Sequence, residues 1–447
     1  MTWVALGLLA LTTFLLVWHH VRHLSRTPWW LLWAVLMLPG LVVGLWVWLH
    51  GEQQSLPALL VVVPFMLSGL FYLILVKQGG GGAHLALQTG EPTPLTAAEL
   101  THLRQCFPWE IYPLQRIDQR DGVVLCYGRL RVMAAEAYPV VESKIHTLLG
   151  QRFWLILESN RDHQPVFALV PRRVPAPLAY GWLWGLGSLG LGLGAAMTLT
   201  APHLGISQPL GWTYGVSVLA ILVAREVGQG WVLRRYRVRR AWPWVIPFPL
   251  WPGVLGTYGG LAEPLPHRRA LVDRTLVGLG LALAVTLLLL LWGLGHSRLR
   301  PGGFLPGHSL LVWGLSRWAW SGELTLGMGL QLHPVAWAGV AGLGLLALQL
   351  TPVGRLDGGR LLHGLVGRRA ARRWGWVTKG LILLLGWQVQ PWLRGWGVLL
   401  LLIPSLPPPV LNDVSELDPW RDALGLLALG LFLAIILPVP GFLPRVG

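Results

Sequence analysis

Residues 270–295 read ALVDRTLVGLGLALAVTLLLLLWGLG, an apolar run whose charged residues, Asp273 and Arg274, both lie near its start. About 20 consecutive apolar residues in a helix cross the hydrocarbon core of a bilayer, which is roughly 30 Å thick. A buried helix of a soluble protein rarely needs an apolar stretch of this length. The run therefore predicts a membrane-spanning helix.

Further runs of this kind recur along the 447 residues, of which 54% are hydrophobic and 12% charged. Soluble globular proteins carry about 25% charged residues. Several runs contain Gly and Pro, which membrane helices tolerate. We predict a polytopic α-helical membrane protein with about 8–11 spans. The other candidate spans are residues 3–18, 29–49, 56–76, 178–200, 210–233, 334–350, an interrupted pair within 374–405, and 423–438.

Basic residues give the chain a formal net charge of +16. They occur in short clusters beside apolar runs, as the positive-inside rule predicts for cytoplasmic loops, so we exclude a nucleic-acid-binding protein. The same clusters could contact anionic lipid headgroups. The rule places the N-terminus outside and the polar region after the third span inside. The clusters are residues 19–26, 172–173, 234–240 and 368–373.

Four segments follow from this pattern. Residues 1–78 hold N-terminal transmembrane helices, 79–91 a Gly-rich linker, 92–173 a small cytoplasmic α+β domain, and 178–440 the transmembrane core. Cys106 and Cys126 both fall in the cytoplasmic segment, which predicts free thiols. Within that segment we expect helices over 95–106 and 134–149 and strands over 122–132, 153–158 and 166–171.

The stretch 240–265 combines five prolines with tryptophans and glycines, so it cannot be a helix. It is also too apolar for a solvated loop. Non-helical backbone at membrane depth occurs where protein buries it or where it lines a cavity. We predict a re-entrant or interfacial element that covers a site.

Two charged motifs lie in or at the ends of predicted spans. The first reads AREVGQ over residues 224–229, and the second reads LTPVGRLDGGR over residues 350–360. Ionisable residues inside a membrane are costly and usually mark function. Taken singly, each motif has a plain structural alternative, since a charge near a helix end can reach the interface and Asp-Gly-Gly is a common turn.

Taken together and in this order, the motifs resemble the site-2 protease family of intramembrane zinc metalloproteases. The resemblance is to its plastid and cyanobacterial branch, known from the plant ethylene-dependent gravitropism-deficient and yellow-green proteins, and it covers about residues 100–440. Its other carriers are GRLR at 128–131, RRYRV at 234–238, IPFP at 246–249, LGTYG at 255–259, LPHRRALVD at 265–273, LHP at 332–334 and residues 413–419.

The resemblance implies a metal site, because the first motif of the family is His-Glu-x-x-His. Its two histidines bind zinc and its glutamate is the general base, while the aspartate of the second motif is the third protein ligand. The matching positions here are Arg225, Glu226, Gln229 and Asp357. Both histidines are therefore replaced. Arginine has no lone pair to donate, and the glutamine amide oxygen suits harder cations than zinc.

Further positions follow from the same resemblance. Gln349 stands where the family pattern leads us to expect an asparagine before Pro352. Substrate or structural roles are implied for Gln349, Pro352, Gly256, Gly259, Gly358 and Gly359. Without zinc, Glu226 and Asp357 would be buried anions, and we predict that the Arg225 guanidinium pairs with them and holds two helices together.

No other histidine has helix-face spacing to a second ligand, so we expect structural roles for His267, His308, His333 and His363. We therefore expect no cofactor and a catalytically inactive pseudoprotease that binds transmembrane segments or partner proteases, such as active family members. The alternative is an active intramembrane metalloendopeptidase with unusual zinc ligands. A transporter or channel is a third possibility, disfavoured because the spans are uniformly apolar. By resemblance the protein lies in a cyanobacterial plasma or thylakoid membrane.

Overall fold

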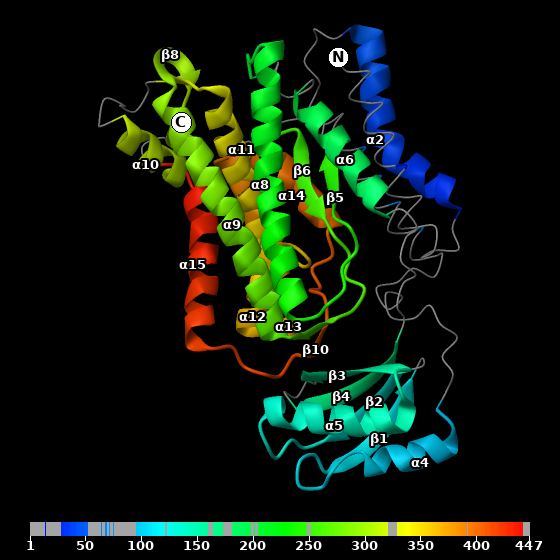
Figure 1. Cartoon of the computed structure of the whole chain (residues 1–447). Coiled ribbons are helices and arrows are strands. Elements are labelled where there is room, and N and C mark those ends of the chain that lie inside the picture. The colour runs from blue at the N-terminus through cyan, green and yellow to red at the C-terminus, as the bar shows by residue number, and fades with distance from the viewer. Residues whose placement is uncertain are drawn as a thin grey trace.

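A computed structural model of the chain describes residues 28–51, 95–120, 123–159, 164–172, 181–197, 201, 204–247, 252–320, 329–390 and 392–440, with the isolated residues Phe14, Pro64, Ser68, Phe71 and Leu75. The fold is mostly helical and carries one mixed sheet (Figure 1). The predicted spans 3–18 and 56–76 lie almost wholly outside the described residues. The polytopic helical class is confirmed.

Three described helices are long and apolar enough to cross a membrane, and a bent pair within α2 (Trp29–His50) adds a fourth if it counts as one span. The three are α8 (Gln208–Arg235), α9 (Arg268–Gly295) and α15 (Pro419–Ile436). Exposed Trp212 and Trp231 stand 19 residues apart on α8, about 28 Å along the axis. Tryptophans at that separation are typical of the two interfaces of a bilayer.

Helix α11 (Pro334–Leu350) is the central helix of the core, and most of its side chains are buried. It contacts α8, α9 and α15. Glycines allow α11 to approach its neighbours this closely. A Cβ atom at Gly339 would lie 2.6 Å from Cβ of Leu290, and one at Gly342 would lie 2.5 Å from Cδ1 of Ile221. Small residues at helix interfaces let membrane helices approach closely. The other core helices are α6 (Gly181–Ala195), α10 (Leu310–Ala319), α12 (Asp357–Val366), α13 (Arg368–Gln388) and α14 (Leu393–Leu402).

The predicted re-entrant stretch forms a β-hairpin. Strands β5 (Trp244–Pro247) and β6 (Val254–Tyr258) pair antiparallel, and the hairpin packs against α6, α8 and α11. Tyr214 on α8 donates a buried hydrogen bond to the Pro252 carbonyl at 2.8 Å. Burial within protein is what allows non-helical backbone at this depth. A second small sheet joins β8 (Arg298–Phe304) to β9 (Leu330–Gln331) near the helix ends remote from the soluble domain (Figure 1).

The soluble domain is built from α4 (Ala97–Gln105), β1 (Leu114–Arg120), β2 (Val123–Gly128), α5 (Ala134–Leu149), β3 (Phe153–Ser159) and β4 (Pro165–Pro171). Helix α4 begins at a capping box made by Thr96 and Glu99. Cys106 and Cys126 are buried free thiols, as predicted. Burial raises the pKa of Cys126 to about 12, so this thiol stays protonated and unreactive.

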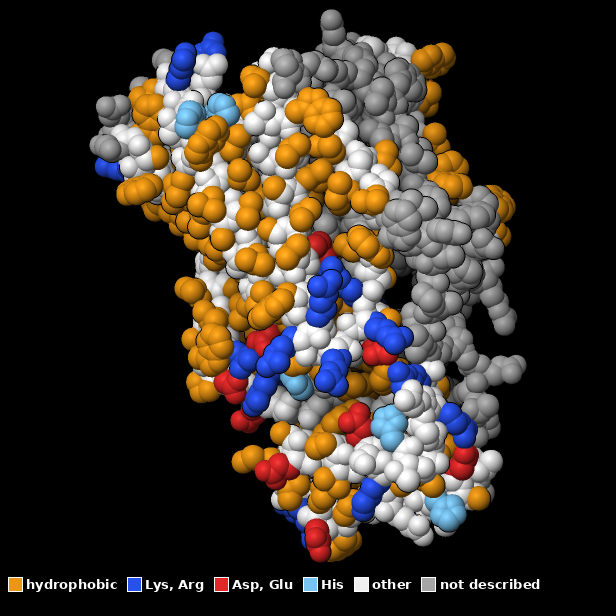
Figure 2. Space-filling model, viewed as in Figure 1, with side chains coloured by type: hydrophobic (Ala, Val, Ile, Leu, Met, Phe, Trp, Pro, Cys, Tyr) orange, Lys and Arg blue, Asp and Glu red, His pale blue; other side chains and the backbone are white. Residues whose placement is uncertain are grey.

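The sheet of this domain also takes two strands from the membrane core. Its strand order is β1-β2-β4-β3-β10-β7, where β10 is Val410–Asn412 and β7 is Leu265–His267. Asn412 pairs with Leu157 on one side and His267 on the other. Ion pairs from Arg368 to Glu158 and from Arg172 to Glu263 join the two parts. Figure 2 shows basic side chains gathered at this junction, below an apolar surface over the helices.

Asp413 follows β10 and ties the sheet to the core. Its Oδ1 accepts from His363 Nε2 at 2.6 Å and from Arg268 Nε at 2.9 Å, and its backbone N–H donates to the Leu157 carbonyl. Burial raises the pKa of this carboxyl, but the hydrogen bond and charge of His363, together with Arg268, outweigh burial and hold it below its ordinary value.

We predict that acid loosens this junction. Because the folded pKa of Asp413 is depressed, its stabilisation is fully present above the unfolded value of about 4 and is lost as pH falls through the folded value. Hydrogen exchange of the Asp413 amide, corrected for intrinsic rate, should accelerate as pH falls below about 4, so that it is faster at about pH 3 than at about pH 5. The Asp413→Asn variant should exchange faster at pH 5 and lack this pH dependence. Equal protection of this amide in the wild type at pH 5 and pH 3 would contradict the prediction. Asp118→Asn on β1 is the control and should leave protection of the Asp413 amide unchanged.

Candidate functional site

The two charged motifs meet at a buried ion pair between α8 and α12. The Arg225 guanidinium donates to Oδ2 of Asp357 from Nε at 3.0 Å and from Nη2 at 2.6 Å. The two side chains are 6% and 2% exposed. Arg225 lies six residues before Trp231, about 9 Å deeper along α8. The predicted ion pair is therefore present, at membrane depth.

Glu226 extends the pair to the β-hairpin. Its Oε1 accepts from the Thr257 hydroxyl at 2.5 Å and from Arg225 Nη1 at 3.0 Å, while Thr257 in turn accepts from Arg225 Nη1 at 2.8 Å. Arg240, which precedes the hairpin, donates to Glu226 Oε2 at 3.3 Å and to the Glu226 carbonyl at 3.1 Å. The hairpin thus covers the site as predicted, and it supplies hydrogen-bond partners to it.

Gln229 lies one turn after Arg225 on the same face of α8 but turns to another partner. Its Oε1 accepts from Arg274 Nε on α9 at 3.0 Å, and its buried Nε2 has no hydrogen-bond partner among the described residues. A side chain at Gly278 would lie 2.6 Å from Cγ of Gln229. The glutamine therefore packs tightly between α8 and α9, beside the carboxylates but not bonded to them.

Arginines outnumber carboxylates in this cluster. Oδ1 of Asp357 accepts from Arg360 Nη1 at 2.8 Å, so each oxygen of Asp357 has a cationic partner. Arg225, Arg240 and Arg360 bond Glu226 or Asp357, and Arg274 lies next to them through Gln229. Paired and hydrogen-bonded charges are the form in which ionic groups persist away from water. We call these four arginines and two carboxylates the ionic cluster.

The predicted glycines hold backbone segments close together around the ionic cluster. Gly256 has φ +131°, and a side chain there would lie 2.6 Å from Nε2 of Gln349. Gln349 Nε2 also lies 3.5 Å from the Leu255 carbonyl, so the end of α11 touches the hairpin. Gly359 packs on the Gly354 carbonyl. Gly259 makes only ordinary contact with Pro243, and Pro352 lies in the turn that joins α11 to α12.

We predict that Gly358→Ala is destabilising, because the added methyl group would overlap the Leu350 carbonyl where α12 begins. Overpacking costs about 1–3 kcal/mol, and here the clash is with backbone rather than with a movable side chain. Gly280→Ala on α9 is the matched control, since a methyl group there meets nothing within 4 Å. Thermal unfolding in detergent measures both. Equal midpoints for the two variants would contradict the prediction.

Four residues of this site were not predicted from the sequence to belong to it. Thr257 and Arg360 lie inside the quoted motifs, and Arg274 is a charge within the apolar run 270–295, which is itself a signal. Arg240 was assigned only to a basic cluster. Their roles depend on which helix faces which, and that information is not contained in the spacing of either motif.

The residues present do not fit a zinc ion. A catalytic zinc needs three protein ligands, and arginine offers no lone pair. Within the part of the chain that the structure describes, no group of three His, Cys, Asp or Glu could hold a metal. His267 and His333 accept hydrogen bonds from backbone N–H groups that begin α9 and α11, and His363 bonds Asp413.

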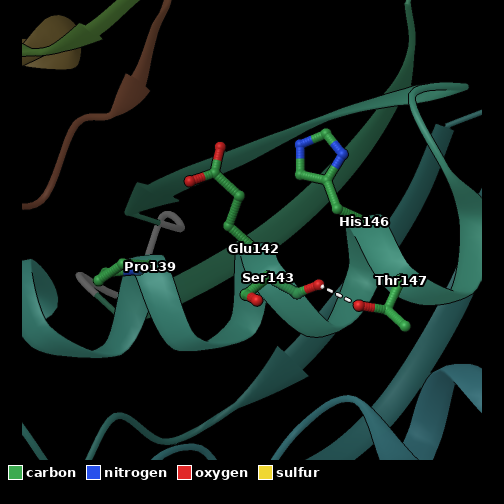
Figure 3. Close-up of a pocket in the computed structure, with 5 residues that line it drawn as sticks. All are labelled: Pro139, Glu142, Ser143, His146 and Thr147. Atoms are coloured by element: carbon green, nitrogen blue, oxygen red, sulfur yellow. Dashed lines mark hydrogen bonds between the residues drawn. The ribbon is translucent and has the colours of Figure 1, made fainter.

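A separate hollow of about 610 Å³ lies on the soluble domain (Figure 3). Figure 3 shows Glu142 and His146 on the same side of α5, with Thr147 donating to the Ser143 carbonyl at 3.0 Å. Four of its five lining residues are exposed and Glu142 is partly exposed. This is a solvated helix face rather than an assembled catalytic site.

Fold and site together define a polytopic helical membrane protein with a buried ionic cluster at membrane depth, next to a soluble α+β domain. Comparison with known proteins shows distant homology to plant EGY proteins. The chain is 32% identical to the probable zinc metalloprotease EGY1, chloroplastic, of Arabidopsis thaliana, over 54% of its own length and 45% of that protein. It is 25% identical to the probable zinc metalloprotease EGY2, chloroplastic, of the same plant, over 75% and 64%.

A rice protein, the probable zinc metalloprotease EGY3, chloroplastic, of Oryza sativa subsp. indica, is 24% identical over 77% of this chain and 65% of its own length. The chain therefore spans about half to two thirds of the length of these relatives. No family model and no solved structure matches it. The similarity agrees with the resemblance inferred from the motifs, at the level of distant homology.

Proposed function

We propose that this protein is a site-2-protease-like pseudoprotease, which binds transmembrane segments or partner proteases without cutting them. The relatives are named probable zinc metalloproteases. In this chain the positions that match the family's two zinc-binding histidines are Arg225 and Gln229. A guanidinium permanently protonated at neutral pH lies where the metal ligands would converge.

The observation that carries the proposal is the double hydrogen bond from Arg225 to Asp357. Oδ2 of Asp357, the residue at the family's metal-ligand position, accepts two N–H donors from Arg225, at 2.6 Å and 3.0 Å. Arg360 holds the other oxygen. Glu226, which matches the family's general base, is likewise bonded to Thr257 and Arg225. Each carboxylate thus has three of its about four lone-pair sites occupied by N–H or O–H donors, which disfavours metal binding and proton abstraction.

Several features support a membrane partner. Helices α8, α13 and α15 expose apolar side chains to the bilayer, where another transmembrane helix could pack. The basic residues near the ends of α8 and α13 could hold anionic headgroups. The motif resemblance to the plastid and cyanobacterial branch supports a cyanobacterial plasma or thylakoid membrane as the location, and the plant relatives are named chloroplastic.

The test is the zinc content of the purified full chain, measured by elemental mass spectrometry beside Asp357→Ala. The pseudoprotease predicts near-zero zinc in both samples. About one zinc per chain, lost in the variant, would overturn the proposal and favour an active intramembrane metalloendopeptidase with unusual ligands. A second arm reconstitutes the protein with a photo-crosslinking transmembrane peptide, for which crosslinking without cleavage is expected. Cleavage abolished by Glu226→Gln would also overturn the proposal.

A further inference from the structure

A pair of histidines lies at the end of the membrane core remote from the soluble domain (Figure 1). His296 is the C-cap residue of α9, and His333 is the N-cap residue of α11. Their ring centroids are 6.0 Å apart, and the ring planes are inclined at 54°. Figure 2 shows histidine side chains together on the exposed surface at this end. Sequence spacing could not predict this pair, because two different helices supply it.

Buried contacts hold the backbone on both sides of the pair. Ser297 Oγ accepts from the His333 N–H at 3.0 Å and donates to the Gly293 carbonyl at 2.8 Å. A Cβ atom at Gly293 would overlap the Ala336 nitrogen, so the end of α9 and the start of α11 are in direct contact. Because both segments are fixed before any ligand arrives, a ligand that joins the two rings has little ordering cost.

Trp292 orients both imidazoles. It stacks on His296 with centroids 4.1 Å apart, and it meets His333 edge to face at 5.4 Å. The Trp292 carbonyl lies 2.8 Å from Nδ1 of His296. A carbonyl can only accept, so this Nδ1 carries the hydrogen and Nε2 carries the lone pair. Metal-binding histidines typically donate their other ring N–H to a backbone carbonyl or a carboxylate in this way.

The second ring is also available for a metal. Nδ1 of His333 accepts from the Val335 N–H at 3.3 Å, and Nε2 of neither ring has a hydrogen-bond partner among the described residues. Burial, with repulsion from a protonated His296, lowers the pKa of His333, so this imidazole is neutral at pH 7. Metal binding through Nε2 requires the ring hydrogen to move to Nδ1, at the loss of one long hydrogen bond.

The ring geometry and the ligand type indicate which ion fits. Two imidazoles bound to one ion at metal–nitrogen distances of about 2.0 Å have centroids roughly 4.5–6 Å apart, depending on the angle at the metal. The observed 6.0 Å lies at the upper end of this interval. Imidazole suits copper, zinc and nickel, whereas magnesium and calcium prefer carboxylate and carbonyl oxygens. Among the divalent ions, copper(II) binds nitrogen ligands most tightly.

We propose that His296 and His333 form a binding site for a divalent transition-metal ion, with copper(II) preferred over zinc and nickel. Water completes the coordination, and the ion joins the end of α9 to the start of α11. The site is separate from the ionic cluster and independent of the proposed function. Metal bound here survives Asp357→Ala and is lost in His296→Phe, the reverse of what zinc at the ionic cluster would show.

The experiment titrates copper(II) into the untagged, chelator-treated full chain in lipid nanodiscs and follows binding by calorimetry. His296→Phe keeps a ring that stacks on Trp292, and His333→Asn keeps a side-chain acceptor at the N-cap of α11. Each variant should weaken this binding by about 100-fold, because a second ligand held nearby acts at a high effective concentration. The double variant gives the background from other copper ligands, which is subtracted.

His50→Phe is the matched control. His50 stacks on Trp46 with centroids 3.8 Å apart and has its Nδ1 3.2 Å from the Trp46 carbonyl, but no second histidine ring contacts it among the described residues. This variant should leave the copper affinity unchanged. Copper should also raise the thermal unfolding midpoint of the wild type and not that of His296→Phe. Equal losses in His50→Phe and His296→Phe, or a wild type that copper does not stabilise, would overturn the proposal.

Discussion

Replacing Arg225 with alanine is expected to lower the free energy of unfolding by about 3–5 kcal/mol, the cost of breaking a buried ion pair by removing one partner. Oδ2 of Asp357 loses both of its N–H donors, while its Oδ1 keeps Arg360. Glu226 keeps Thr257 and Arg240. The loss of stability should therefore arise mainly at the contact between α8 and α12. Denaturant unfolding in mixed micelles measures it.

Two further variants distinguish the contribution of the ion pair to the free energy of unfolding from that of side-chain packing. Arg225→Lys keeps the charge but cannot donate through two nitrogens to one carboxylate, so an intermediate loss is expected. Asp357→Asn combined with Arg225→Ala removes the unpaired anion and should recover part of the loss, a coupling of about 0.5–3 kcal/mol. Arg373→Ala, at an exposed position of α13, is the control. If Arg225→Ala unfolds at the same denaturant concentration as Arg373→Ala, the ion pair does not hold the helices together.

The sequence predicted the helical elements where periodicity and length were informative. The expected run 334–350 is α11, and the expected helix 134–149 is α5. Less of the sheet was predicted, because apolar and polar residues alternate too weakly in β1 to indicate a strand. Strands β7 and β10 were not predicted, since three-residue strands carry no pattern of their own. Strand β10 is defined by its pairing with β3 far away in the chain, and β7 by its pairing with β10.

The candidate site shows the same division between local and distant information. Arg225 and Asp357 could be paired from sequence because charge in an apolar segment demands a counter-charge. Matching Gln229 to the family motif gave no partner for it, since its bond to Arg274 depends on how α8 and α9 are rotated. Thr257 was not predicted as a site residue for another reason. Its hydroxyl matters only because the hairpin folds back over α8.

The charge balance of the ionic cluster supports the proposed replacement of two zinc-binding histidines by Arg225 and Gln229. A zinc ion would supply two positive charges between Glu226 and Asp357, whereas Arg225 supplies one and carries directional donors. Arg360 and Arg274 add positive charge nearby. The fold can thus keep its two carboxylates buried without a metal. Histidines restored to positions 225 and 229 would have to compete with that arrangement.

Restoring those histidines is the second large effect expected. The Arg225→His/Gln229→His variant places two imidazoles one turn apart on α8 and should bind about one zinc per chain, whereas near-zero zinc is expected of the wild type. Arg360 still bonds Asp357, and Arg274 loses its Gln229 partner, so the affinity should rise further when Arg360→Gln is added. Elemental mass spectrometry and competition with a chromophoric chelator measure stoichiometry and affinity.

Adding Asp357→Ala to the two-histidine variant is the control for this gain of zinc binding. It should abolish binding in the two-histidine variant, because only two protein ligands and Glu226 would remain, and Glu226 is held by Thr257. Thermal unfolding supplies an independent measurement, since zinc that binds only the folded state raises its stability with concentration. If the two-histidine variant folds but takes up no zinc, then the α8 and α12 backbones do not present these positions to a common point, and Arg225 does not stand in for a metal.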